Sequence, residues 1–273
     1  MSRIFELLNK SSGEVADLVR PLVDEQTRGT ARSNGESQGS EVSSLASVRT
    51  LSLRIPAPSP LLPFEGGQWQ TDEQYRILRT KISQFPTQPR VIAISSPAPG
   101  DGKSVTAINT AGALALKSEA AVLLVDADLR KPTLHEQLGL PQSPGLADVL
   151  AGACALEDAM VHTKEFHSLY TMSSGTTSAN LVELLDSKQW RTVCTKLRGM
   201  FRYVIIDSPP VAAVADYALI QDVCDGVILV VRPYWTNRNL CRQALDLVPK
   251  AKFLGVLLNR VAAAKQLGEA LAE

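Results

Sequence analysis

The sequence predicts an α/β fold with a mainly parallel sheet flanked by helices. After residue 90, short apolar runs rich in β-branched residues alternate with segments of helical spacing. The runs are apolar at consecutive positions rather than at alternate ones, which is typical of strands buried on both faces. Six runs carry this prediction: VIAIS (91–95), AVLLV (121–125), LYTMS (169–173), YVIID (203–207), VILVV (227–231) and FLGVLL (253–258).

The composition narrows the class of protein. The 273 residues suffice for one sizeable core with an appended segment, and Lys+Arg equal Asp+Glu at 28 each, which does not favour nucleic acid or an anionic membrane as partner. The four cysteines include no Cys-x-x-Cys pair and the three histidines lack ligand spacing, so we expect neither structural zinc nor disulfides. No apolar run approaches the roughly 20 residues that span a bilayer. We therefore expect a cytoplasmic protein without a membrane span of its own.

Two N-terminal segments precede the predicted domain, which we place at residues 66–273. Apolar positions between Ile4 and Val23 favour one or two short amphipathic helices, which either bind a partner or dock on nothing. Residues 27–65 are rich in Ser, Gly and charged residues and then in Pro, a composition typical of a linker. We expect residues 1–65 to be an amphipathic segment followed by a flexible, disordered linker.

The predicted domain opens with a helix over residues 71–85. Thr71 or Asp72 is the expected N-cap, and Pro86 and Pro89 prevent continuation of the helix. The first strand follows. Because parallel strands present their carboxyl ends at one edge of a sheet, we look for chemistry in the residues just after each run.

A glycine-rich loop between the first strand and a long helix predicts a phosphate-binding site. In SSPAPGDGKSVTAINTAGALAL, glycines let backbone N–H groups approach phosphate oxygens, and the following helix adds its positive N-terminal end. In such a P-loop Lys103 reaches the β- and γ-phosphates and Ser104 ligates Mg²⁺, although Pro97 stands where the usual pattern has its first glycine. The alternative is a glycine-rich turn with an exposed lysine. The expected nucleotide-binding residues of the loop are Pro99, Gly100, Asp101, Gly102, Lys103, Ser104 and Val105.

Three aspartates follow strands of the predicted sheet. VLLVDADLRKP places Asp126 and Asp128 two residues apart, so strand geometry directs both carboxylates to one face. VIIDSPP supplies Asp207, where a Mg²⁺-holding acid is expected. Each aspartate alone is also compatible with a turn or cap. Three carboxylates close together repel one another, however, so their convergence predicts a divalent cation.

These three motifs together resemble the bacterial protein-tyrosine kinases of exopolysaccharide and capsule synthesis, relatives of the ParA and MinD ATPases. The resemblance covers about residues 68–262 and implies ATP and Mg²⁺ as cofactors. It implies that Lys103, Asp126 and Asp128 are the catalytic residues. Asp126 and Asp128 are the candidates for the base and for a metal ligand, and which of the two is the base stays open. Ser104, Asp126 and Asp207 are then the candidate metal ligands.

Two further elements match the same family. Glu73, Arg76 and Arg79 have the E-x-x-R-x-x-R spacing of a helix motif that mediates ring assembly, so the resemblance implies a homo-oligomer. Read alone, these three residues are a solvated charged face. Asn259 follows the last strand, where relatives have an asparagine that contacts adenine; the alternative is a turn asparagine. We assign no role to Arg130, which follows the acid pair.

One departure concerns the phosphate acceptor. Family members usually end in a tyrosine-rich tail that is phosphorylated in trans, whereas the last tyrosine here is Tyr234. We therefore expect acceptors on another protein or at internal tyrosines. The five internal candidates are Tyr75, Tyr170, Tyr203, Tyr217 and Tyr234, of which Tyr203 precedes a buried strand and is expected in the core.

Three functions are compatible with these motifs. The favoured one is a tyrosine kinase of polysaccharide export, recruited to the inner face of the cell membrane by the cytoplasmic segment of a membrane co-polymerase that regulates chain length. This partner is implied by the resemblance alone. The second is a ParA/MinD-like ATPase switch without protein phosphorylation, whose usual second loop lysine is missing among Pro97, Ala98 and Pro99. The third is a scaffold that binds ATP without turnover.

Overall fold

The computed structural model describes residues 3–4, 45–56, 69–116, 121–176, 180–211 and 215–261. In these residues nine strands form one sheet in the order β1-β9-β8-β3-β7-β4-β6-β5-β2. The six consecutive strands from β9 to β6 all run parallel, which confirms the predicted α/β fold. The strands are β1 (Arg3–Ile4), β2 (Arg49–Leu51), β3 (Val91–Ser95), β4 (Val122–Asp126), β5 (Met160–Thr163), β6 (Leu169–Met172), β7 (Tyr203–Asp207), β8 (Gly226–Val231) and β9 (Phe253–Leu258).

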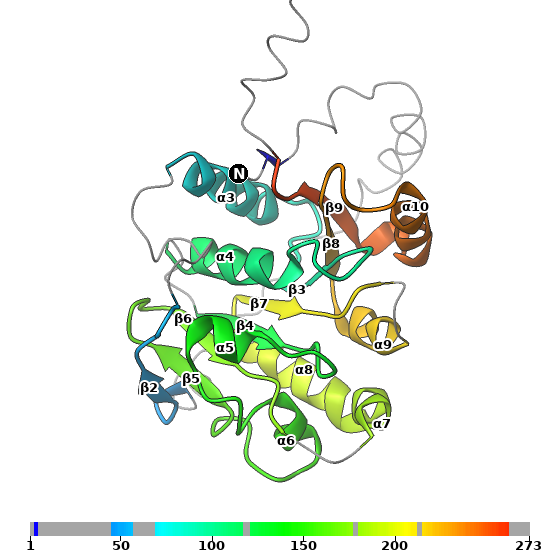
Figure 1. Ribbon diagram of the computed structural model, residues 1–273. Coiled ribbons are helices and arrows are strands. Elements are labelled where there is room, and N and C mark those ends of the chain that lie inside the picture. The colour runs from blue at the N-terminus through cyan, green and yellow to red at the C-terminus, as the bar shows by residue number, and fades with distance from the viewer. Residues whose placement is uncertain are drawn as a thin grey trace, which may run out of the picture.

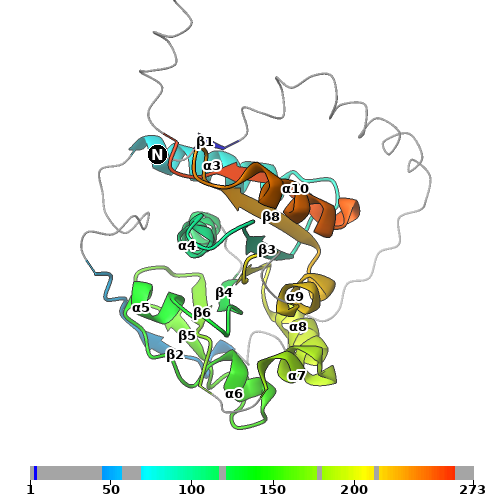
Figure 2. The same cartoon turned by 45° about the vertical axis from the view of Figure 1, so that its right-hand side comes forward.

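Helices cover both faces of the sheet (Figures 1 and 2). One face carries α3 (Trp69–Ser83), α4 (Lys103–Ala115) and α5 (Leu134–Leu138). The other carries α6 (Leu146–Leu150), α7 (Leu181–Asp186), α8 (Lys188–Met200), α9 (Asp216–Val223) and α10 (Arg238–Leu247), and a short 3-10 helix, η2 (Lys250–Lys252), precedes β9. Among the described residues, none of the helices combines the length and the apolar character that crossing a bilayer requires.

Strand β3 shows why the predicted runs are apolar at every position. Ile92 and Ile94 point into the core beneath α3 and α4, while Val91 and Ala93 point into the core on the opposite face, where α9 contacts β3. All four side chains are buried. Because successive strand residues face opposite sides, a sheet covered on both faces needs apolar residues throughout. Burying an isoleucine or valine side chain contributes roughly 1.5–3 kcal/mol, so this strand anchors the centre of the fold.

The sheet extends into the segment that the sequence favours as linker. Strand β2 lies inside residues 27–65 and pairs in parallel with β5, and the Leu53 backbone N–H donates to Glu165 Oε1 at 3.0 Å. The linker interpretation is therefore wrong for this stretch, because the open edge of β5 offers backbone partners that composition does not reveal. Of the predicted linker, residues 27–65, the structure describes only residues 45–56, which include β2.

The far N-terminus contributes strand β1. Arg3 and Ile4 pair antiparallel with Leu258 and Leu257 of β9. The predicted amphipathic helix therefore does not begin at Ile4, since the free edge of β9 supplies backbone partners for an extended segment. The remainder of that predicted segment lies outside the described residues.

Helix α3 begins two residues earlier than predicted and ends two residues earlier. Thr71 and Asp72 thus lie in its first turn rather than at the N-cap, because Trp69 and Gln70 already adopt helical geometry. Tyr75, Leu78 and Ile82 form its buried face, at the spacing of an amphipathic helix, and α3 packs against α4. Strand β5, which no sequence pattern predicted, pairs antiparallel with β6.

Candidate functional site

The predicted phosphate loop joins β3 to α4. Gly100 and Gly102 adopt φ values of +86° and +98°, in the left-handed region that side chains with a Cβ rarely occupy. Helix α4 begins at Lys103 directly after Gly102, which offers no side chain to cap the helix. The first N–H groups of α4, with the positive end of the helix, therefore face the loop and suit an anion.

Asp101 holds the loop in shape from the inside. Its buried carboxylate accepts a hydrogen bond from the Ala98 backbone N–H at 3.1 Å and another from the Thr236 hydroxyl at 2.6 Å. Burial raises the pKa of Asp101, although these hydrogen bonds oppose the rise. The Asp101 side chain is thus part of the framework of the loop, and the predicted role of this residue in nucleotide binding stays a prediction.

Asn259 packs against the same loop. Its side-chain amide donates to the Asp101 carbonyl oxygen at 2.8 Å, and a Cβ at Gly102 would collide with that amide. The glycine is thus required both by its φ value and by the close approach of Asn259. The predicted contact of Asn259 with adenine stays a prediction.

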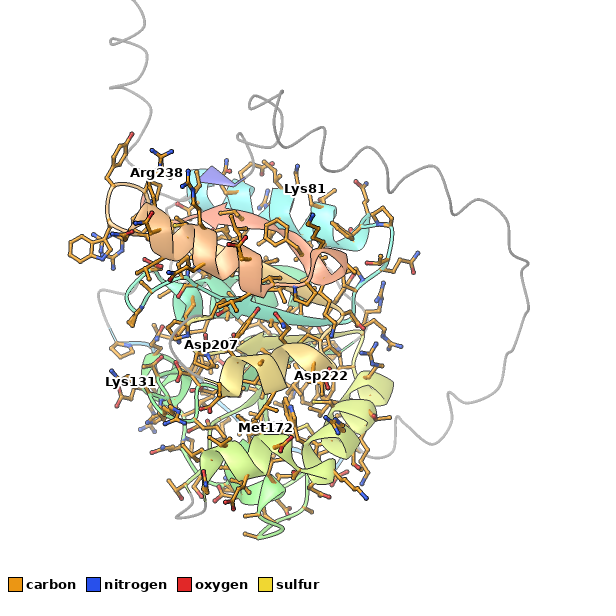
Figure 3. All side chains as sticks on the ribbon, turned by 90° about the vertical axis from the view of Figure 1, so that its right-hand side faces the viewer. Lys81, Lys131, Met172, Asp207, Asp222 and Arg238 are labelled. Atoms are coloured by element: carbon orange, nitrogen blue, oxygen red, sulfur yellow. The ribbon has the colours of Figure 1, made fainter. Side chains whose placement is uncertain are left out.

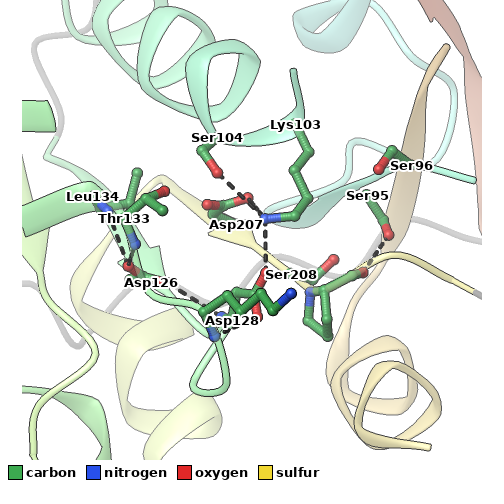
Figure 4. Close-up of polar contacts among 12 residues, drawn as sticks. Ser95, Ser96, Lys103, Ser104, Asp126, Asp128, Thr133, Leu134, Asp207 and Ser208 are labelled. Carbon is green, nitrogen blue, oxygen red and sulfur yellow. Dashed lines mark hydrogen bonds and ion pairs between the residues drawn. The ribbon is translucent and has the colours of Figure 1, made fainter. Parts of the chain in front are cut away.

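Lys103 and the three predicted acids meet at the carboxyl edge of the sheet (Figure 4). Asp126 and Asp207 are direct neighbours in the β4–β7 register, although 81 residues separate them in the sequence. Lys103 Nζ lies 2.8 Å from Asp128 Oδ2 and 3.5 Å from Asp207 Oδ1. Burial opposes the charge of Lys103, but Asp207 and Asp128 together outweigh it and raise the pKa of this lysine.

The carboxylates of Asp126 and Asp207 are used differently. Asp126 accepts backbone N–H bonds from Thr133 and Leu134, both at 3.1 Å, and from Asp128 at 3.2 Å, so it ties the start of α5 to β4. Both oxygens of Asp207 are buried without a hydrogen-bond partner. Burial raises the pKa of Asp207 to about 6 against the opposing charge of Lys103. Burial and the charge of Asp207 raise the pKa of Asp126 to about 8.

These residues fit a Mg²⁺ ion that is completed by other ligands. The Ser104 hydroxyl lies 3.3 Å from Lys103 Nζ, beside the buried carboxylate of Asp207, which has the ion pair with Lys103 but no hydrogen bond. In the described part of the chain, no group of three Asp, Glu, His or Cys side chains is arranged to hold a metal by itself. Mg²⁺ commonly takes only one or two carboxylates and fills its remaining positions with phosphate oxygens and water. The sequence argument from three repelling carboxylates also left out Lys103, which already supplies a positive charge.

A cleft of about 490 Å³ opens over the loop, within the range of small-molecule sites. Six of the seven predicted loop residues line it, all except Asp101; Asp128 lines it as well, whereas Asp126, Asp207 and Asn259 do not. Sequence reasoning missed several lining residues, for which no motif was available: Thr133, Gln137, Pro209, Pro210 and Arg260.

Arg130 and Lys131 also line the cleft, and Arg130 has a clear partner. Its guanidinium forms two hydrogen bonds with the buried carboxylate of Asp216 on α9, at 2.6 and 3.1 Å. Such a bidentate pair fixes both distance and orientation. It therefore fastens the loop after β4 to the start of α9.

Comparison with known proteins agrees with this geometry. Residues 89–242 match the AAA domain family. The tyrosine-protein kinase YwqD of Bacillus subtilis (strain 168) is 37% identical over 191 residues, which cover 68% of this chain and 80% of YwqD. This chain belongs to the bacterial protein-tyrosine kinases of exopolysaccharide and capsule synthesis. The family predicted from the sequence is thus confirmed.

Solved structures place the kinase fold in a wider group. The crystal structure of the chimerical protein CapA2B2 is 34% identical, with a TM-score of 0.66, and the match covers 69% of this kinase and 84% of that chain. MinD of Pyrococcus horikoshii OT3, solved with Mg-ADP, is 28% identical with a TM-score of 0.50, over 61% of this kinase and 67% of MinD. The kinase therefore shares its fold with the MinD group of proteins, as the sequence predicted.

Proposed function

We propose that this kinase transfers the γ-phosphoryl group of ATP to a tyrosine hydroxyl at the cleft over the phosphate loop. The observation that carries the proposal is the ion pair of Lys103 with Asp128, since it joins a phosphate-binding cation to an acid that lines the cleft. Phosphoryl transfer needs positioning and charge stabilisation more than covalent chemistry by the protein. A cleft with these two groups supplies both.

Phosphate binding falls to the loop and to the first turn of α4. The N–H groups after Gly100 and Gly102 receive the phosphate oxygens, and Lys103 leaves Asp128 to contact the β- and γ-phosphates. Asn259 is the proposed contact of the adenine. This exchange releases the Asp128 carboxylate at the moment when the donor is in place.

Asp128 is the proposed base. Asp126 is committed to three backbone N–H groups and does not line the cleft, whereas Asp128 lines it and is held by Lys103 and by the Lys131 N–H at 3.2 Å. In the transfer step the tyrosine Oη forms a bond to the γ-phosphorus, the bond from that phosphorus to the leaving oxygen of ADP breaks, and the tyrosine proton passes to Asp128.

Ser104 and Asp207 are the proposed Mg²⁺ ligands. Asp126 is the neighbour of Asp207 on the adjacent strand. The fit rests on the Asp207 oxygens that have no hydrogen-bond partner and on the neighbouring hydroxyl. When bound, Mg²⁺ neutralises charge on the β- and γ-phosphates. Asp126 orients the start of α5, and its elevated pKa reflects a buried acid that a cation would stabilise in charged form.

We further propose a homo-oligomer through α3 and a partner at the membrane. Glu73 and Arg76 form an exposed ion pair at 3.6 Å, so both are accessible to a second copy. Arg79 differs, because it donates to the Ala113 carbonyl oxygen of α4 at 3.2 Å and thereby fixes α3 on α4. The proposed partner is the cytoplasmic segment of a membrane polysaccharide co-polymerase, which recruits the kinase to the inner face of the membrane.

The test is incubation of the purified protein with Mg²⁺ and γ-labelled ATP, alone and with the cytoplasmic segment of the co-polymerase. A glutamate–tyrosine copolymer serves as acceptor, and Asp128→Asn, which keeps the size of the side chain, is the matched control. We expect label on tyrosine with the wild type, and transfer reduced by about 10²–10⁴-fold in the variant. If label appears only in free phosphate, both with and without the co-polymerase segment, the kinase proposal is refuted and an ATPase switch remains.

A further inference from the structure

The five tyrosines of the sequence differ sharply in accessibility. Tyr75, Tyr203 and Tyr217 are buried, with exposed fractions of 3%, 6% and 2%. Tyr170 is half-buried, with its ring 4.7 Å from the ring of His162. Tyr234 is 100% exposed. A kinase cleft must enclose an acceptor hydroxyl, so among these tyrosines only Tyr234 meets that requirement without local unfolding.

Tyr234 also has an unusual backbone. Its φ is +61°, in the left-handed region, which is an outlier for a bulky side chain. The residues around it form a tight turn after β8, in which the Trp235 and Thr236 N–H groups donate to the Arg232 carbonyl oxygen at 3.2 and 2.9 Å. The turn thus holds the tyrosine outward at an energetic cost, and such strain is concentrated at functional positions.

The turn is attached to the phosphate loop. Thr236, two residues after Tyr234, donates a hydrogen bond from its hydroxyl to the Asp101 carboxylate inside that loop. Figure 3 shows Arg238, at the start of α10, and Lys131, which lines the cleft, on the same side of the molecule. The turn that carries the exposed tyrosine is therefore tied directly to the phosphate loop rather than to a remote part of the fold.

We propose that Tyr234 is a phosphate acceptor, modified in trans by the cleft of a second copy of this chain. A fully exposed side chain touches nothing in its own chain, so its hydroxyl lies outside its own cleft and is presented to another molecule. In the step, Tyr234 Oη forms a bond to the γ-phosphorus of ATP in the second copy. ADP leaves as the other phosphorus–oxygen bond breaks, and the proton passes to Asp128 of that copy. This inference rests on the proposed kinase function.

A mixing experiment tests the inference. Tyr234→Phe keeps the cleft and serves as donor, while Asp128→Asn keeps Tyr234 and serves as acceptor; the two carry tags of different mass. After incubation with Mg²⁺ and γ-labelled ATP, with the co-polymerase segment present, we expect phosphate on Tyr234 of the Asp128→Asn chain. The Asp128→Asn chain alone should remain unlabelled. Tyr170→Phe is the matched control and should be labelled at Tyr234 like the wild type.

A glutamate–tyrosine copolymer in every reaction separates the possible failures. Label on the copolymer and on other tyrosines of the chain, but not on Tyr234, overturns this inference and keeps the proposed kinase. Label on Tyr234 of wild-type chains but never on the mixed Asp128→Asn chain overturns transfer between copies. The absence of tyrosine label from both copolymer and chain refutes the kinase function, and this inference with it.

Discussion

Replacing Thr236 with valine should loosen the phosphate loop from a distance. The Thr236 hydroxyl donates to Asp101 at 2.6 Å and accepts a hydrogen bond from the backbone N–H of Arg232 at 3.0 Å. Valine has nearly the same shape and the same β-branching but no hydroxyl. Thr236→Val therefore removes these hydrogen bonds and little else.

The size of the effect follows from the burial of Asp101. The residue has an exposed fraction of 0%, so water cannot replace the lost donor, and a hydrogen bond to a charged group contributes about 1.5–3 kcal/mol. We expect the free energy of unfolding to fall by about that amount near pH 7. If half of this lost free energy destabilises only the ATP-binding conformation of the phosphate loop, the Kd for ATP rises by about tenfold or less. The difference from wild type should shrink at low pH, since a protonated Asp101 no longer carries an unpaired charge.

Urea unfolding and fluorescence titration with a labelled ATP analogue measure the two effects. Thr236→Ser is the matched control, because it retains the hydroxyl, and it should stay within about 0.5 kcal/mol of wild type. The reasoning is refuted if Thr236→Val unfolds like the wild type, or if Thr236→Ser loses as much stability as Thr236→Val.

Two further outcomes are expected. The free energy of unfolding without ligand should fall as pH rises from about 5 to about 8. The folded pKa values of Asp207 (about 6) and Asp126 (about 8) lie above the ordinary 3.8, so the folded state holds protons that the unfolded state has released. Asp126→Asn should flatten this slope in urea titrations at several pH values, and stability that rises across the window contradicts the argument. Arg76→Ala should reduce the oligomer size in sedimentation velocity and leave ATP affinity unchanged, because Arg76 is exposed on α3. Lys196→Ala on α8 is its control, and equal losses of assembly in both variants count against an α3 interface.

Local sequence determined the central strands and the phosphate loop. Each of the six predicted runs became a strand with bounds shifted by at most one residue, because complete burial on both faces leaves a pattern that needs no distant information. The positions of Gly100 and Gly102 in the loop could be predicted for a similar reason, since their positive φ values favour glycine directly. The convergence of Asp126 and Asp207 followed from the rule that parallel strands end at one edge.

The tertiary structure alone decided which partners these residues take. The pairing of β2 with β5 depends on an open strand edge, and an edge has no sequence signature of its own. Asp101 and Thr236 are 135 residues apart, and Arg130 and Asp216 are 86 apart, so neither hydrogen-bonded pair leaves a local pattern. The exposure of Tyr234 is likewise a property of the folded surface. Sequence periodicity reports the burial and geometry of a residue's own segment. These contacts depend instead on the spatial order of the strands in the sheet, which brings distant segments together.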